Sequence, residues 1–175
     1  YNPNLPANQQ TLSDGLTPEM HDAYKFAYKH RITTKPNIIE ADMYGPLDSI
    51  SMAKMLSNYA INILGMLPDI NRINQFADVP EELDEEFNNW VTLAYQLWIM
   101  WINMPNNEFR PYDLVPRSEF ATALSRMLYK IPDGRQERAE EYYTPHFSKL
   151  KEEWILSVLD PDIEELRWYV MIMLK

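Results

Sequence analysis

Apolar residues recur at helical spacing in several stretches of the chain, and most of these stretches are bounded by turn residues. One face of a helix is formed by Met52, Met55 and Leu56, and another by Phe120, Ala123 and Leu124. No alternating run is long enough for a strand, so we expect at most three-residue bridges in the loops. The pattern therefore predicts an all-α, mainly helical fold. The helices are expected near residues 19–30, 48–65, 86–97, 117–130, 142–153 and 163–174.

A helix–loop–helix pattern recurs three times along the chain. The first helix of each unit ends in a dipeptide X-Ile, in which X is Arg31, Trp98 or Trp154. After a loop, the second helix begins near Ser49, Arg117 or Arg167. A single unit of this kind cannot bury its apolar face, whereas three units can share one core.

This periodicity divides the chain into four segments. Residues 1–18 are rich in Asn, Pro and Gln and are interpreted as an N-terminal linker or arm. Thr17 and Pro18 then form a typical helix start. The three units are expected at 19–73, where the pattern is degenerate, at 74–135, where it is strongest, and at 136–175, where it is short.

Composition narrows the possible functions. The net charge of −10 argues against nucleic acid as a partner, because phosphates require clustered Lys and Arg. No run of 18 apolar residues is present, so we expect no membrane span. The chain contains no cysteine, which excludes disulfides and cysteine-ligated metals. It begins without a Met or a basic segment, and we interpret it as part of a longer protein.

Catalytic and metal-binding chemistry finds little support in the residue pattern. His21, His30 and His146 lie near predicted helix ends, without the spacing of a catalytic triad or a zinc site. No glycine-rich phosphate loop is present. The acidic run 81–86 is compatible with a cation site, but a solvated helix face is the favoured interpretation. We therefore predict no catalytic residue, no metal and no cofactor.

The segment 76–128 resembles the S-layer homology repeat. The resemblance rests on the phrase Phe76-Ala77-Asp78-Val79-Pro80, on a first helix ending at Trp98-Ile99, and on the loop that leads from Asn106-Asn107 through Phe109-Arg110-Pro111 to Arg117-Ser118-Glu119-Phe120-Ala121. Family members commonly carry three such repeats, folded into a pseudo-threefold helical spindle. Their grooves bind cell-wall-linked polysaccharide that is often pyruvylated.

The resemblance implies a non-catalytic module that anchors an exported protein to the bacterial cell surface. Arg117 would bind a sugar carboxylate, with Glu119 and Arg167 in support. Rings for a sugar face would come from Trp98, Trp101 or Tyr112. A structural role for Arg117 and Glu119, as a pair joining neighbouring units, remains equally open. Only the second unit carries both residues, because Ser49 and Ser51 replace them in the first unit and Tyr169 replaces the Glu in the third.

Three further functional hypotheses follow from other features of the sequence. The abundant aromatic residues, among them 11 Tyr and 5 Trp, suit a protein-interaction or self-assembly module. A structural module of a surface protein, without glycan affinity, is the second alternative, and a glycan-hydrolysing enzyme is the third. Self-association through a longer chain is compatible with each of them. The predicted location is the extracellular cell surface or cell wall.

The tryptophans stand at unexpected positions. The family places glycine at the X of X-Ile, where a positive φ is needed, and this chain has Trp98, Trp154 and Arg31 there. Trp101 falls on the next common glycine. We therefore predict a positive φ or a remodelled helix end at positions 98 and 154.

Overall fold

The computed structural model describes residues 7, 10–100, 107–130 and 142–175. The described part of the chain is all-α, as predicted, and its only extended structure consists of three isolated antiparallel bridges. Its helices are α1 (Pro18–Lys29), α2 (Ser49–Asn62), α3 (Glu81–Glu86), α4 (Trp90–Gln96), α5 (Arg117–Tyr129), α6 (Thr144–Glu152) and α7 (Arg167–Met173).

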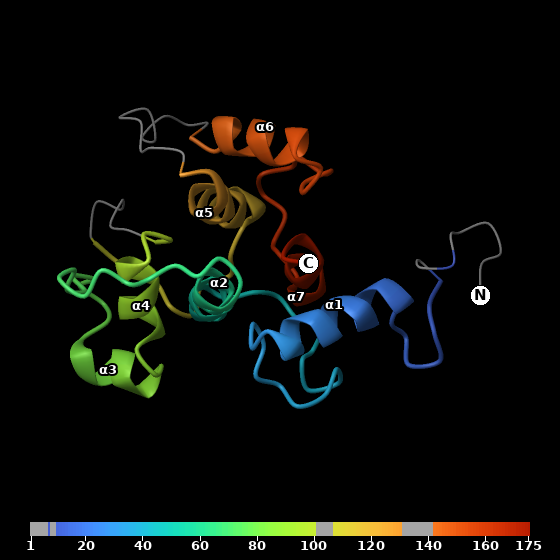
Figure 1. Ribbon diagram of the computed structural model, residues 1–175, viewed down its shortest axis with the longest axis horizontal. Helices are drawn as coiled ribbons and strands as arrows, with labels where there is room; N and C mark the ends of the chain where they lie inside the picture. Colours follow the sequence, from blue (N-terminus) through green and yellow to red (C-terminus); the bar gives the residue numbers. More distant parts are fainter. Residues whose placement is uncertain (1–6, 8–9, 101–106, 131–141) are drawn as a thin grey trace.

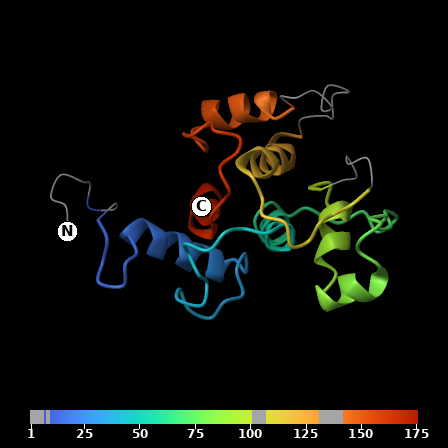
Figure 2. The same cartoon turned by 180° about the vertical axis from the view of Figure 1, so that it is seen from behind.

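All of the described helices except α3, which contacts α4, pack in three pairs around the centre of the molecule (Figures 1 and 2). Helix α1 packs against α7, α4 against α2, and α6 against α5. One helix of each pair, α1, α4 or α6, ends at an X-Ile step. Its partner, α7, α2 or α5 respectively, belongs to a different part of the chain and begins after a loop. Because α1 packs against α7, the first and last of these helices lie side by side.

Three loop segments meet at the centre and exchange backbone hydrogen bonds in a cycle. The amide of Leu47 donates to the carbonyl of Glu165, the amide of Glu165 to Val115, and the amide of Val115 to Leu47, over 2.8–2.9 Å. Two residues further along each segment the pattern recurs, with Ser49 donating to Asp113, Arg117 to Ile163 and Arg167 to Gly45. These bonds place the starts of α2, α5 and α7 at equivalent positions around one centre.

The three X-Ile steps end their helices with the same geometry. Arg31, Trp98 and Trp154 have φ of 59°, 61° and 61°, so the predicted positive φ at positions 98 and 154 is confirmed. The following Ile32, Ile99 and Ile155 each donate a backbone hydrogen bond to the carbonyl five residues earlier. This arrangement is a Schellman ending, in which glycine normally occupies the left-handed position. The chain turns inward there, and Ile32 and Ile99 are fully buried.

The helix predicted over 86–97 begins later than expected: α4 covers Trp90–Gln96 of this segment, and a separate helix, α3, ends at Glu86. Asn88 and Asn89 both adopt positive φ and separate α3 from α4, which the tolerance of Asn for this conformation explains. Asp84, at the end of α3, accepts hydrogen bonds from the amides of Val91 and Thr92 at 3.0 Å. A buried carboxylate on one helix thus caps the next.

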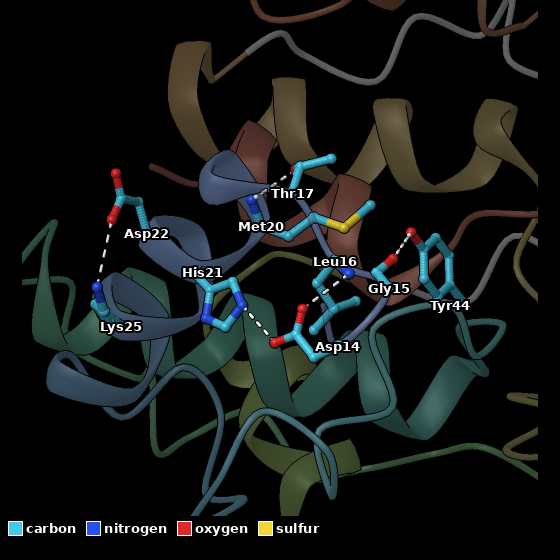
Figure 3. A network of polar contacts seen from close by, with 9 residues as sticks. All are labelled: Asp14, Gly15, Leu16, Thr17, Met20, His21, Asp22, Lys25 and Tyr44. Atoms are coloured by element: carbon cyan, nitrogen blue, oxygen red, sulfur yellow. Dashed lines mark hydrogen bonds and ion pairs between the residues drawn. The ribbon is translucent and has the colours of Figure 1, made fainter. Parts of the chain in front are cut away.

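Within the segment interpreted as an N-terminal arm, 1–18, the residues just before α1 are attached to the helical module. Leu16 is buried in the core, and its amide donates to the carboxylate of Asp14 (Figure 3). The Thr17 hydroxyl caps α1 through the amide of Met20, as its sequence position predicts. Tyr44 donates its hydroxyl to the carbonyl of Gly15 and fastens this turn to the first loop.

Candidate functional site

Arg117, the predicted carboxylate ligand, is buried at the start of α5. Its Nε and Nη2 donate to the two carboxylate oxygens of Glu165 at 2.6 and 3.2 Å, and its Nη1 donates to the carbonyl of Val158. Glu165 has an exposed fraction of 0%. Burial raises the pKa of this carboxyl, although the Arg117 guanidinium acts in the opposite direction. The guanidinium therefore already holds a carboxylate from the protein itself.

Glu119 does not pair with Arg117 but lies beside Arg110. The distance from Arg110 Nη2 to Glu119 Oε1 is 3.6 Å, and Arg110 Nη1 lies 3.3 Å from Asp113. Burial raises the pKa of Glu119, the positive charge of Arg110 lowers it, and the negative charge of Asp113 raises it further, with a net upward shift. The expected Arg117–Glu119 pair is thus replaced by two separate ion pairs.

Asp78 organises the loop that carries Arg110. Its two carboxylate oxygens accept hydrogen bonds from the amides of Phe109 and Arg110, both at 2.7 Å. Arg110 is held at a φ of 54°, and Phe109 is buried against Phe76. The Asp of the Phe-x-Asp-Val phrase therefore has a structural role that the sequence did not specify.

Arg167 and Tyr112 each have a partner other than Arg117. Arg167, at the start of α7, donates to Asp42 at 2.8 Å. A Cβ at Gly45 would require the ends of the Asp42 and Arg167 side chains to shift. Tyr112 is exposed, with its ring edge-on to Phe87. Trp101 lies outside the described residues.

Among the predicted rings that the structure describes, only Trp98 contacts a cation that lines a cavity. The guanidinium carbon of Arg72 lies 3.4 Å from the centre of the Trp98 ring and 4.0 Å from that of Tyr95. Cation–π contacts of this kind fix the orientation of a guanidinium. Sequence reasoning did not identify Arg72, yet a signal was present: it is the only Lys or Arg between Lys54 and Arg110.

Arg72 lines a cavity of about 470 Å³ beside α3 and α4. Amide, hydroxyl and carboxyl side chains share this cavity with exposed aliphatic ones: Asn74, Asn89, Thr92, Gln96, Glu81, Ile70 and Ile73. A concave surface with a few polar groups, a cation and apolar patches is typical of a small-ligand site.

The wall of the cavity is held in place by hydrogen bonds. Gln96 donates its side-chain amide to the carbonyl of Arg72, and its own carbonyl accepts from the amide of Asp69. Asn74 accepts from the amide of Phe76 and donates to the carbonyl of Val79. The linker between α2 and α3 is therefore fixed onto α4, and with it the backbone of Arg72.

No family model and no curated protein matches the chain. The candidate site is therefore described from the structure alone. Among the described residues, no three or more His, Asp and Glu side chains gather into a group suited to a metal ion. Within the same residues, no helix is both long and apolar enough to cross a membrane.

Proposed function

We infer that the chain is a non-catalytic anchoring module of the S-layer homology type, which attaches a larger exported protein to cell-wall-linked polysaccharide at the bacterial surface. The cyclic arrangement of three helix pairs around three hydrogen-bonded loops is the observation that carries this inference. A pseudo-threefold spindle is the fold that the sequence resemblance implies. In support of the proposal, the described residues of the two weaker units, 19–73 and 142–175, contribute helices and loops to the same hydrogen-bonded cycle as the central unit.

The Arg72 cavity supports the binding part of the proposal. Its polar amides, aliphatic surfaces and oriented cation suit a sugar that carries hydroxyl groups and an acidic substituent. The proposed mechanism is reversible capture without bond making or breaking. The overall negative charge of −10 opposes a polyanion, so short-range contacts with arginine must outweigh a repulsion that salt screens.

A structural or self-assembly module without glycan affinity is the second candidate function. The burial of Arg117 against Glu165 favours it, because the arginine assigned to glycan binding instead joins two loops of the protein. Under this alternative the chain would associate with copies of itself, and wall material would not retain it.

Co-sedimentation with purified sacculi from the producing bacterium separates the two candidates. An anchoring module sediments with intact sacculi and stays in solution when the wall polysaccharide has been removed with hydrofluoric acid. Analytical ultracentrifugation of the chain alone provides the second measurement. Concentration-dependent assembly without sacculus binding would contradict the anchoring function and support the alternative.

A further inference from the structure

The stretch 23–39 is a basic segment within an acidic protein. It carries Lys25, Lys29, Arg31 and Lys35 without any Asp or Glu, whereas the whole chain has a net charge of −10. All four of these basic side chains belong to solvent-exposed residues. Clustered positive charges create a local positive potential even on a protein whose net charge is negative. The segment is therefore a candidate surface for an anion.

Helix α2 adds one further lysine to this basic segment. Lys54 Nζ donates a hydrogen bond to Thr34 Oγ1 at 2.6 Å, and Asn62, two turns further along α2, donates to the carbonyl of His30 at 2.9 Å. Burial lowers the pKa of Lys54, and the positive charge of Lys35 lowers it further. Two lysines from separate parts of the chain therefore lie close enough to repel each other.

No carboxylate of the described chain neutralises these two lysines. Among the described residues, the ion pairs of lysine involve Lys25 and Lys149, and neither Lys35 nor Lys54 takes part in one. Glu40 is the nearest acidic residue to Lys35 in the sequence, but it accepts a hydrogen bond from Asn37 at 2.6 Å. A bound anion would relieve the repulsion between the two ammonium groups.

The Thr34 hydroxyl and the two ammonium groups together determine which anion suits this place. Thr34 accepts from Lys54, so its own hydrogen is available to a ligand oxygen. An ammonium is a compact charge with three rotatable donors and suits a tetrahedral phosphate, whereas a planar carboxylate is matched better by a guanidinium. The Tyr24 hydroxyl donates to the carbonyl of Lys35 at 2.9 Å and fixes the backbone beside these groups. The arrangement therefore favours phosphate.

We propose that Lys35, Lys54 and the Thr34 hydroxyl form a binding site for a phosphate group, carried by a monoester or by a phosphodiester. The site shares no residue with the Arg72 cavity. It goes beyond the proposed function, because it is expected in a module with glycan affinity and equally in one without it. The other exposed basic residues of the segment attract the anion from a distance and are assigned no direct contact.

The test titrates the full chain with inorganic phosphate, glycerophosphoglycerol and acetate at constant ionic strength. Nuclear magnetic resonance of the Lys54 side chain and the Thr34 amide should show saturable shifts with phosphate and none with acetate. Bound phosphate should also raise the pKa of Lys54, because an adjacent anion stabilises the ammonium. A response to glycerophosphoglycerol identifies a phosphodiester as ligand, and a response to inorganic phosphate alone restricts the site to monoesters. Equal shifts with acetate, or none with either phosphate, would overturn the proposal.

Variants then assign the binding to these residues. Lys54→Gln should weaken phosphate binding by about tenfold or more, because it removes a charged hydrogen-bond donor. Thr34→Val keeps the shape of the side chain but deletes the hydroxyl and should also weaken binding, while Thr34→Ser should retain it.

Lys151→Gln, which removes an exposed charge on α6, is the matched control and should bind phosphate as the parent chain does. Circular dichroism of each variant verifies folding. Unchanged phosphate affinity in folded Lys54→Gln, or an equal loss in Lys151→Gln, would show that the site is not the one proposed.

Discussion

Arg117 and Glu165 form a buried ion pair across the junction between α5 and the loop that precedes α7, with Arg117 Nε 2.6 Å from Glu165 Oε1. The cyclic hydrogen bonds place Leu47 and Val115 at the positions equivalent to Glu165, and both are fully buried apolar residues. The pair thus distinguishes one of three otherwise similar loop contacts. A charged pair at a single position can specify which segments meet, at some expense in stability.

Removing one partner of this pair should be strongly destabilising. Arg117→Ala leaves Glu165 buried without its counter-charge, and we expect the free energy of unfolding to fall by about 3–5 kcal/mol. The double variant Arg117→Met with Glu165→Leu should recover most of this loss, because an apolar pair suits the buried site. Urea denaturation of the single and double variants measures both effects. A loss below about 1 kcal/mol in Arg117→Ala would show that the pair is dispensable.

Glu119 should make stability depend on pH in a defined direction. Its folded pKa lies above the ordinary value of a glutamate, so on raising the pH the unfolded chain loses this proton first. The contribution of Glu119 is therefore fully present below the unfolded pKa and is lost as the pH rises through the folded pKa. The unfolding free energy of the parent chain should decline relative to Glu119→Gln over this interval.

The measurement is urea denaturation of the parent and Glu119→Gln chains from about pH 4 to about pH 7. Glu82→Gln, on the exposed side of α3, is the matched control and should leave the pH dependence unchanged. A difference between parent and Glu119→Gln that grows in favour of the parent as the pH rises would contradict the burial of this carboxyl.

Asp78 should be essential for the loop that leads into α5. Asp78→Ala removes the acceptors of two 2.7 Å hydrogen bonds and leaves Arg110 in a left-handed conformation without support. We expect a loss of roughly 2–4 kcal/mol, since each hydrogen bond to a charged group contributes about 1.5–3 kcal/mol and partial solvation offsets part of it. Thermal unfolding and amide hydrogen exchange at Phe109 and Arg110 report the effect. Unchanged protection of these two amides would refute the role assigned to Asp78.

Trp154→Gly should stabilise the protein although it deletes a large side chain. Trp154 is 95% exposed, so little packing is lost, while the left-handed backbone of a non-glycine residue costs about 1–2 kcal/mol. The greater freedom of glycine in the unfolded chain offsets about 0.4–1 kcal/mol of that gain. Trp154→Ala is the control, because alanine shortens the side chain without relieving the backbone. Equal stabilities of the Gly and Ala variants would exclude backbone strain as the cause.

Local signals in the sequence predicted the helices and their ends well. The Thr17 cap and the positive φ at Trp98 and Trp154 are each determined by residue type and near neighbours. The break between α3 and α4 was missed because two consecutive asparagines interrupt an otherwise helical pattern. Asn tolerates positive φ but does not require it, so composition alone did not locate this break.

The candidate site was harder to predict because it depends on contacts between distant segments. Glu165 lies 48 residues from Arg117 in the sequence, and nothing local to either residue indicates the pairing. Arg72 lies in a linker, and its importance follows from its contacts with the rings of Tyr95 and Trp98, which no local sequence pattern indicates. The sequence showed that aromatic residues are abundant, but it could not show which cation their rings would contact.

The positive φ of the residues that end two helices, at positions 98 and 154, also bears on which amino acid the cell inserts there. UGA is translated as glycine in some bacterial lineages and as tryptophan in others, and glycine is the residue that both helix ends favour. UGA codons in a glycine-reading host would give the cellular protein glycine at both positions, and Arg72 would rest on Tyr95 alone. UGG codons would make the tryptophans, and their strained backbone, native. The codon at position 98 thus determines whether an indole ring lies on Arg72 in the living cell.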